Sequence, residues 1–406
     1  MRLKSKTKLG HGLWLVFLLG FFVMSQPAAA QSDGSEAKPY AKLDRQSVTY
    51  RGPLDRKAKE LPEGVAPIGI ILALSGPGQA EGKALLAAAQ IALEEEQARG
   101  TLADGRKLTL VARDESGPWG QASSEILKLV DEDHALVVLT SANGNTAHQA
   151  DQLANKISFP ILTLASDPTT TEANVPWLFR LGPSDTDQVR AFCQRIYTEL
   201  GLHYVLLIVQ SDHDGRIGGG EFEKAARELG ANPPEKVEIA SSPASLESLS
   251  ASIGAKNPDA IVVWTDANLA RKLLPAIRKD TAGASVFLCQ KAAQFAGEDA
   301  ELGRMFTVGS VQMQQKASAN NFEQTYRART GASPGSDAVE VYEAVHLVAD
   351  GLRRVGANRI LLREFFATLG KTADAAGAIS FDPAGNSTQK FAVVELSAAA
   401  AVASHP

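Results

Sequence analysis

Residues 68–82 read IGIILALSGPGQAEG, an apolar run that leads into three closely spaced glycines. The run from Ile68 to Leu74 predicts a buried strand, and the amphipathic spacing from Ala80 to Glu96 predicts a helix. The glycines therefore lie in a strand-to-helix turn, where unpaired N–H groups and the positive end of the helix dipole can hold a ligand carboxylate. A tight turn that binds no ligand is the alternative.

Alternating strands and helices continue beyond this turn in two similar series, over residues 67–181 and 186–305. This order predicts parallel strands joined by crossover helices, with runs such as Ile261-Val262-Val263 covered on both faces. The expected fold class is α/β, with two Rossmann-like lobes that form a clamshell around a cleft. The predicted strands are Ile68–Leu74, Leu108–Arg113, Ala135–Leu139, Ile161–Leu164, Tyr204–Val209, Val237–Ile239, Ala260–Trp264, Val286–Leu288, Phe306–Val308, Ala378–Phe381 and Lys390–Leu396. The predicted helices are Ala80–Glu96, Ala122–Val130, Thr186–Leu200, Glu221–Leu229, Leu269–Lys279 and further helices within residues 316–369.

The first 30 residues have the order of a cleavable signal peptide. Four basic residues precede the apolar run Leu13–Met24, and the small residues Ala28–Ala30 follow it. We expect cleavage after Ala30 and a soluble exported protein, with an uncleaved membrane anchor as the alternative. The polar, proline-containing residues 31–66 predict an extended lead segment, and residues 397–406 a tail.

Composition excludes several classes of protein. The 406 residues are 44% hydrophobic and 21% charged, which suits two or three compact units and not a disordered chain. The formal charge is −5 and no basic patch follows residue 10, so we expect no nucleic-acid partner. Cys193 and Cys289 are too few for a disulfide scaffold, and we expect both to be buried.

Signatures of catalysis and metal binding are weak. The sequence has no Gly-x-Ser-x-Gly elbow, its histidines are scattered, and Asp212-His213-Asp214 departs from the calcium-loop pattern at its fifth and sixth positions. Gly76, Gly78 and Gly82 only approximate a dinucleotide-binding loop, even with Asp114 placed after the second strand. We therefore expect no catalytic residues, no metal and no cofactor, and an oxidoreductase is the least favoured function.

Four segments carry a resemblance to a known family. They are Ser75-Gly76-Pro77 with Ala80 and Gly82, the strand end Arg113-Asp114-Glu115, the strand Phe159–Thr163 and the crossover Phe179–Gln188. Together they resemble the periplasmic leucine/isoleucine/valine-binding protein family, the solute receptors of branched-chain amino acid ABC importers. The resemblance spans about residues 66–396, and the crossover is its most specific part.

The resemblance implies a type I periplasmic-binding-protein clamshell with three crossover strands. It implies an N-terminal lobe of residues 67–183 plus about 310–376 and a C-terminal lobe of 184–309 plus about 377–396, with the third chain crossing near Ala378. It also implies a periplasmic location, a small-molecule ligand, an ABC permease of the inner membrane as partner and no catalysis. Membrane contact would then occur only through the permease.

The family holds the α-carboxylate of its ligand with backbone amides and hydroxyls of first-lobe loops, and the ammonium with an acid of the second lobe. The first-lobe loops of this chain are expected at Ser141–Thr146 and Ala165–Asp167. Both would also make good helix caps, which is the alternative for them. The residues that match the first-lobe positions are Ser75, Gly76, Asn143, Asn145, Thr146, Ala165 and Ser166.

The chain departs from the family at several pocket positions. Asp167 stands where a hydroxyl residue is usual, and Glu81 where the wall is often apolar or aromatic. Lys291 lies near the position of the ammonium-binding acid, which would partly reverse the polarity of the pocket, unless the alignment is shifted and Lys291 is solvated. A second-lobe loop is expected at Asp212–Gly218, where Arg216 or Ile217 stands in place of the usual tyrosine. The remaining candidates are Thr265 and Asp266, as an alternative ammonium acceptor.

Two functions on this fold stay open at this point. The first is a non-catalytic receptor that captures a small polar compound, such as an amino acid, between two lobes and presents it to a permease. The second is a ligand sensor, or an amide- or urea-type receptor, that reports to a signalling partner. The sequence does not distinguish the two, because both use the same closure of the lobes.

Overall fold

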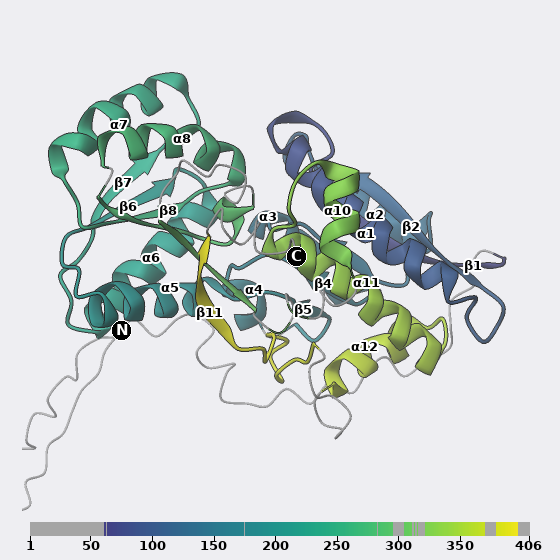
Figure 1. The fold of residues 1–406 in the computed structure, drawn as a ribbon. Coiled ribbons are helices and arrows are strands. Elements are labelled where there is room, and N and C mark those ends of the chain that lie inside the picture. Colours follow the sequence, from purple (N-terminus) through teal and green to yellow (C-terminus); the bar gives the residue numbers. More distant parts are fainter. Residues whose placement is uncertain are drawn as a thin grey trace, which may run out of the picture. The chain divides into compact units, whose positions relative to one another are not determined.

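The computed structural model of the chain describes residues 61, 63–173, 175–281, 283–294, 304–310, 312, 315, 321–369 and 379–396. All of them lie in the unit Lys42–Pro406, and Figure 1 shows their arrangement. The predicted signal peptide, most of the predicted lead segment, the tail and the predicted chain crossing near Ala378 lie outside these residues. No helix in the described part of the chain is both long and apolar enough to cross a membrane.

The first sheet has five parallel strands in the order β2-β1-β3-β4-β5. Its strands are β1 (Val65–Leu72), β2 (Lys107–Asp114), β3 (Val138–Thr140), β4 (Ile161–Thr163) and β5 (Leu178–Arg180). The helices that follow these strands are α1 (Gln79–Ala98), α2 (Gln121–Asp131), α3 (Gly144–Ile157) and α4 (Thr169–Glu172). We call this sheet and the helices packed on it the first lobe.

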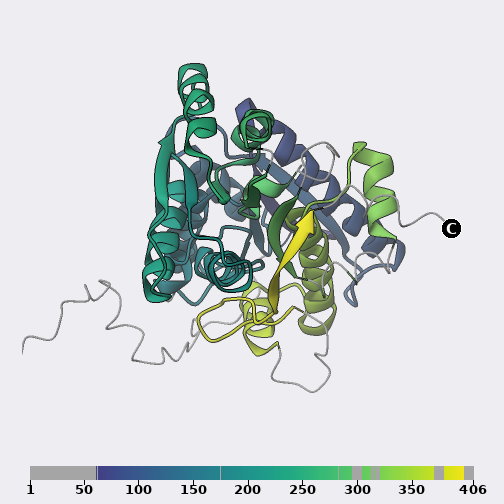
Figure 2. The ribbon, with the colours of Figure 1, turned by 60° about the vertical axis from the view of Figure 1, so that its left-hand side comes forward.

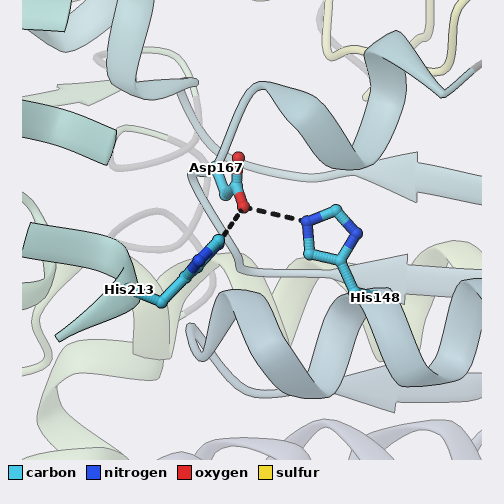
Figure 3. A group of neighbouring side chains, drawn as sticks. All are labelled: His148, Asp167 and His213. Atoms are coloured by element: carbon cyan, nitrogen blue, oxygen red, sulfur yellow. Dashed lines mark hydrogen bonds and ion pairs between the residues drawn. The ribbon is translucent and has the colours of Figure 1, made fainter. Parts of the chain in front are cut away.

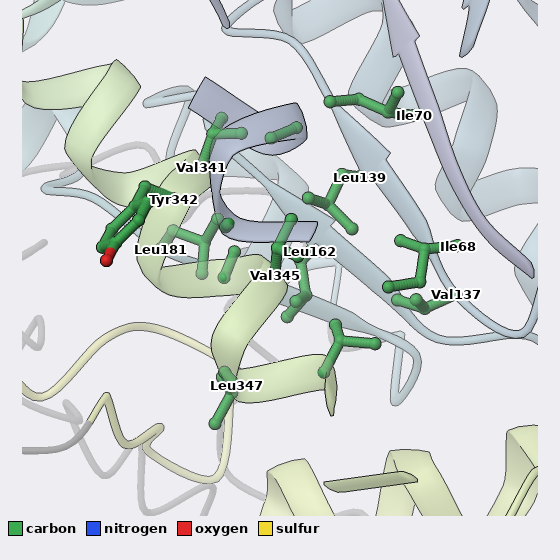
Figure 4. Close-up of a cluster of buried hydrophobic side chains, with 14 of the residues drawn as sticks. Ile68, Ile70, Val137, Leu139, Leu162, Leu181, Val341, Tyr342, Val345 and Leu347 are labelled. Carbon is green, nitrogen blue, oxygen red and sulfur yellow. The ribbon is translucent and has the colours of Figure 1, made fainter. Parts of the chain in front are cut away.

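Both faces of the first sheet are buried, as the near-continuous apolar runs of its strands predict. One face packs against α1 and against three helices from much later in the chain, α10 (Phe322–Thr330), α11 (Ser336–Val355) and α12 (Arg359–Thr368). Figure 4 shows Ile68, Ile70 and Leu139 of this face beside Val341 and Val345 of α11. The opposite face packs against α2 and α3. The first lobe is therefore held together by segments far apart in sequence.

The second sheet has six strands in the order β11-β10-β9-β8-β6-β7, and only β11 runs antiparallel to its neighbour. Figure 2 shows β11 as the yellow strand. The strands are β6 (Val205–Gln210), β7 (Glu235–Ile239), β8 (Ala260–Trp264), β9 (Ser285–Leu288), β10 (Met305–Ser310) and β11 (Phe391–Leu396). The helices are α5 (Asp185–Cys193), continued by the π-helix η2 (Gln194–Glu199), α6 (His213–Glu228), α7 (Pro243–Lys256), α8 (Ala267–Asp280) and the short η3 (Lys291–Ala293). We call this group the second lobe.

The crossover between the lobes ends in a capped helix. Ser184 accepts a hydrogen bond from the backbone N–H of Asp187, and the Asp187 carboxylate accepts one from the N–H of Ser184. This capping box satisfies two backbone N–H groups at once, so α5 begins at Asp185, directly after its N-cap Ser184. The sequence Gly-Pro-Ser-Asp-Thr-Asp therefore encodes the point at which the chain enters the second lobe.

The expected fold class is confirmed, and the predicted strands lie within a few residues of the observed ones. Two expected loops are wrong: residues 144–146 form the first turn of α3, and residues 213–218 form the first turns of α6. The expected late strand Ala378–Phe381 is wrong as far as it is described, because Phe381 makes only a single bridge, with Ser387. The predicted lobe boundaries stay a prediction.

Candidate functional site

The carboxyl ends of β1, β2 and β3 lie side by side, because Leu72 pairs with Asp114 and Ile71 pairs with Thr140. Segments that follow these strands, and segments that follow β8 and β9 of the second sheet, enclose a cavity of about 130 Å³. We call it the inner cavity. Its walls are Leu72, Ala73, Pro77, Gly78, Glu81, Gly82, Leu85, Glu115, Ser141 and Asn143 from the first lobe, and Asp266, Asn268 and Lys291 from the second.

A larger cavity of about 370 Å³, which we call the outer cavity, adjoins the inner one. The two share four wall residues, Pro77, Gly78, Glu81 and Asn268. The remaining walls of the outer cavity come from α1, α8 and α10 and from the segments after η3 and α10. Glu81, in the first turn of α1, therefore lies where the two cavities meet.

Lys291 is the only basic residue among the described walls of the inner cavity, and it already has a partner. Its Nζ lies 2.9 Å from Oδ2 of Asp214, and both side chains are about one fifth exposed, at 20% and 21%. Burial opposes the charged form of Lys291, but the nearby carboxylates of Asp214 and Glu81 outweigh it and raise the pKa of Lys291 above its usual value. Lys291 is therefore a charged residue within an acidic surrounding.

Asp214 also contacts the opposite lobe. The backbone N–H of Gly144, at the start of α3, donates to Asp214 Oδ1 at 3.2 Å. A helix amino terminus favours a carboxylate, because its N–H groups are unpaired and its dipole is positive at that end. Asp214 therefore joins Lys291 of its own lobe to the first lobe.

Glu81 is the acid of the cavity that lacks compensation. Burial raises the pKa of Glu81 to about 7; Lys291 opposes the rise, and Asp337, Asp266 and Glu115 add to it. No described residue donates a hydrogen bond to its carboxylate. The raised pKa means that burial and the neighbouring acids favour the protonated form of Glu81 more than water does.

Glu115 and Asp266 complete the acidic walls. Thr146 Oγ1 donates to Glu115 at 2.6 Å and Ser141 Oγ donates to it at 2.9 Å, while burial raises the pKa of Glu115 overall. Asp266 caps α8 through the N–H of Leu269 at 2.7 Å. Both carboxylates are thus held in fixed positions by donors of their own lobes.

A family model described as "Periplasmic binding protein" matches residues 66–401 of the chain. The chain belongs to the periplasmic binding protein family. No curated protein matches its sequence.

Solved structures of the same fold are similar at low identity. LivJ, a branched-chain amino acid transporter substrate-binding protein from Streptococcus pneumoniae in complex with isoleucine, has a TM-score of 0.68 at 21% identity, covering 82% of this chain and 99% of LivJ. A solute-binding protein from R. palustris in complex with benzoate has a TM-score of 0.70 at 20% identity, covering 82% and 93%. The leucine-binding protein LivK from Thermotoga maritima has a TM-score of 0.68 at 20% identity, covering 81% and 95%. These identities show that the fold is shared.

In this periplasmic binding protein, some of the sequence-predicted site residues line the cavities and others do not. Glu81, Asn143, Asp266 and Lys291 line the inner cavity. Ser166, Thr265, Asp266 and Lys291 line a small recess that lies next to Asp214.

The other predicted residues have different surroundings. Ser75, Gly76, Asn145 and Arg216 are exposed outside the cavity walls, and Ile217 is half-buried on α6. Thr146 is buried and orients Glu115. Ala165 is buried, its N–H donates to Thr163 and its carbonyl accepts from Arg180.

Asp167 lies in a cluster of its own. Its Oδ2 is 3.0 Å from Nε2 of His148 and 2.7 Å from Nε2 of His213, as Figure 3 shows. These bonds, with two from Thr169, outweigh the effect of burial and lower the pKa of Asp167 well below its usual range. None of the three residues lines the inner or the outer cavity.

Sequence reasoning missed three residues on the walls of the inner cavity, Glu115, Ser141 and Asn268. It also missed Asp214, the partner of Lys291. Glu115 lies two positions after the predicted strand end Arg113, and Asn268 lies four positions after Trp264, so nearness to a strand end is a signal that could have found them. Asp114, considered above as part of a loose dinucleotide-binding pattern, accepts hydrogen bonds from the N–H groups of Leu74 at 2.8 Å and Ser116 at 2.9 Å. Asp114 thereby fixes the turn after β1, and this loop is organised around the Asp114 carboxylate.

Proposed function

We propose that the chain is the solute receptor of an ABC importer, works in the periplasm, and binds a small compound carrying a positive charge between its lobes without converting it. Family membership supports the receptor role. The observation that carries the proposal is the inner cavity, which lies at the carboxyl ends of parallel strands of both sheets and takes walls from both lobes. A ligand there contacts both lobes and favours their closed arrangement, a shape that a permease can distinguish.

The charge on the walls supports a ligand with an ammonium or similar cationic group. Three carboxylates, Glu81, Glu115 and Asp266, face one ammonium, that of Lys291. Because Lys291 is already paired with Asp214, an added anion would bring uncompensated negative charge into a confined space. An ammonium would instead gain the carboxylate of Glu81 as a partner.

The two ligands named in the similar structures differ in this respect. Isoleucine, bound by LivJ, has an ammonium group, and benzoate, bound by the R. palustris protein, has none. The acidic walls therefore favour an amino acid or an amine over an aromatic acid as the ligand of this chain.

The first test is thermal unfolding of the purified protein with a panel of amino acids, diamines, guanidinium compounds, benzoates and dicarboxylates. A ligand at 100 times its dissociation constant adds about 2.7 kcal/mol, which raises Tm by a few degrees. Calorimetry then measures the affinity and the protons released. Near neutral pH a cationic ligand is expected to release a fraction of a proton, because it lowers the pKa of Glu81 from about 7.

Glu81→Gln is the variant that tests the site, and Glu228→Gln, exposed at the end of α6, is its matched control. We expect Glu81→Gln to weaken cation binding at least about tenfold and to abolish the proton release, while Glu228→Gln binds normally. A panel in which only benzoates or dicarboxylates raise Tm would contradict the proposed ligand class but not the receptor role. Chemical turnover of a bound compound would contradict the receptor role itself.

A further inference from the structure

His148, Asp167 and His213 come together from three separate segments of the chain. His148 lies on α3, Asp167 follows β4, and His213 opens α6 of the second lobe. In the described part of the chain they form the one group of at least three histidine, cysteine or acidic residues whose potential ligand atoms all lie within 4.8 Å of one another. Figure 3 shows both imidazoles directed at the carboxylate of Asp167.

We propose that His148, Asp167 and His213 bind a divalent first-row transition metal ion, with Zn²⁺ as the representative, and that this ion joins the two lobes. Two imidazoles and one carboxylate are a ligand set that Zn²⁺ takes in proteins. Ligands at roughly 2.0–2.2 Å from one ion lie roughly 3–3.5 Å from each other. The N–O separations of 3.0 and 2.7 Å are close to these values, so small side-chain rotations open the space for the ion.

Asp167 is already oriented as a ligand. Its Oδ1 accepts two hydrogen bonds from Thr169, from the backbone N–H at 2.9 Å and from Oγ1 at 2.7 Å. Its Oδ2 is thereby left to face the imidazoles, and the side chain is only 1% exposed. Metal-binding carboxylates are commonly oriented in this way: outer hydrogen bonds hold one oxygen, and the other oxygen points at the metal position.

The surroundings favour a cation and admit one from solvent. Asp151 and Asp214 both place negative charge near His148. Asp151 is buried, and its Oδ1 has no hydrogen-bond partner among the described residues. The imidazoles themselves are 29% and 31% exposed, so an ion can reach them without a rearrangement of the core.

The site spans the lobes because His213 alone comes from the second lobe. Asp167 lies 19 positions from His148 and 46 from His213 in the sequence, so no compact spacing motif reveals the site. An ion held by all three side chains stabilises the contact between α3 and α6. This goes beyond the proposed receptor function and does not depend on it, since none of the three residues lines the solute cavities.

The test is a titration of the chelator-treated, untagged protein with Zn²⁺ against a competing chromophoric chelator, in wild type and in His148→Gln, His213→Gln and His203→Gln. His203 is exposed and outside the cluster, so its variant is the matched control. We expect one ion per chain in the wild type and the control. Loss of an outer-shell partner typically lowers metal affinity by about 10–100-fold. We expect His148→Gln and His213→Gln, which each remove a direct ligand, to lower the Zn²⁺ affinity by more than this.

Two further measurements keep the outcome decisive. Co²⁺ bound to the wild type is expected to show the intense visible absorption of a four- or five-coordinate site, and Zn²⁺ is expected to raise Tm in the wild type but not in His213→Gln. Circular dichroism of the metal-free variants checks that they fold. Equal Zn²⁺ affinity in all four proteins would overturn the site, and a loss with His148→Gln but not with His213→Gln would overturn its span across the lobes.

Discussion

The two lobes contain equivalent strand-to-helix turns that differ in how their acids are compensated. In the first lobe, Glu81-Gly82 lies in the first turn of α1, after β1. In the second lobe, Asp214-Gly215 lies in the first turn of α6, after β6. Each glycine packs its helix against a backbone carbonyl at the end of the preceding strand: an added Cβ would lie 2.0 Å from the oxygen of Ala73 at Gly82, and 2.1 Å from that of Gln210 at Gly215.

The acid beside each glycine lies in a different electrostatic setting. Asp214 bonds to Lys291 and to the amino terminus of α3, whereas Glu81 has no hydrogen-bond donor in the described structure and its pKa rises to about 7. One backbone design therefore serves two purposes. The second-lobe turn completes an internal charge pair, and the first-lobe turn holds a carboxylate to which no described residue donates a hydrogen bond.

Replacing either glycine tests the shared part of the design and has the largest expected effect. Gly82→Ala and Gly215→Ala each place a methyl group against a backbone carbonyl that cannot move without displacing its strand. We expect each to lower the free energy of unfolding by about 4 kcal/mol or more, measured by urea unfolding.

Gly220→Ala is the control for both variants, because an added Cβ there meets nothing within 4 Å. It lies in α6, where alanine is favoured over glycine by roughly 0.5–1 kcal/mol, so a slight stabilisation is expected. If Gly82→Ala proved as stable as the wild type, the two turns would not share the same helix packing.

Removing the two acids tests the difference between the turns. Asp214→Asn leaves Lys291 without its charged partner, and we expect a loss of about 2 kcal/mol, below the usual cost for a fully buried pair because both groups are partly exposed. Glu81→Gln is expected to act in the opposite direction at pH 8, because it removes a carboxylate that burial and the neighbouring acids disfavour.

The pH dependence of the Glu81→Gln effect follows from linkage. In the folded protein burial raises the pKa of Glu81 from 4.5 to about 7, so the folded state binds the proton more tightly and the wild type loses stability as pH rises through this window. The free energy of unfolding of Glu81→Gln, relative to that of the wild type, should therefore rise by about 1–3 kcal/mol between pH 4.5 and 7. Above pH 7 the difference between the two proteins should stay constant. Urea unfolding at several pH values measures this, and a difference that does not change with pH would contradict it.

Gly144→Ala tests the contact between the lobes and has the smallest expected effect. The backbone of Gly144 suits alanine, but its Cβ would lie 2.5 Å from Oδ1 of Asp214. Since a flexible side chain can shift, we expect a loss of about 1 kcal/mol in urea unfolding. In an Asp214→Ala background most of this loss should disappear, and an unchanged loss there would place its cause within the first lobe.

Much of the fold could be predicted because buried parallel strands read as continuous apolar runs. The beginning of α6 could not, because Gly218-Gly219-Gly220 has the composition of a loop. The structure gives the reason: a Cβ at Gly218 would lie 1.9 Å from Nε1 of Trp264, so glycine is required for close packing of the helix on β8. Tertiary packing thus overrides the low helix propensity of glycine.

The candidate site could be predicted in part, because strand ends are visible in the sequence and the partners of their side chains are not. The sequence placed Lys291 in the pocket and suggested a cationic second lobe. Asp214, which pairs with Lys291, lies 77 positions away. The cluster around Asp167 was missed for the same reason, since its histidines belong to two other helices.

The way both lobes use the end of the chain has a consequence for the order of folding. The strands of the first sheet are complete at Arg180, but three of the four helices that pack on one of its faces lie between Phe322 and Thr368. The second sheet gains its edge strand only with residues 391–396. A chain that emerges amino terminus first therefore closes neither core until nearly all of it has been made. Such a polypeptide therefore lacks a closed core for most of its synthesis.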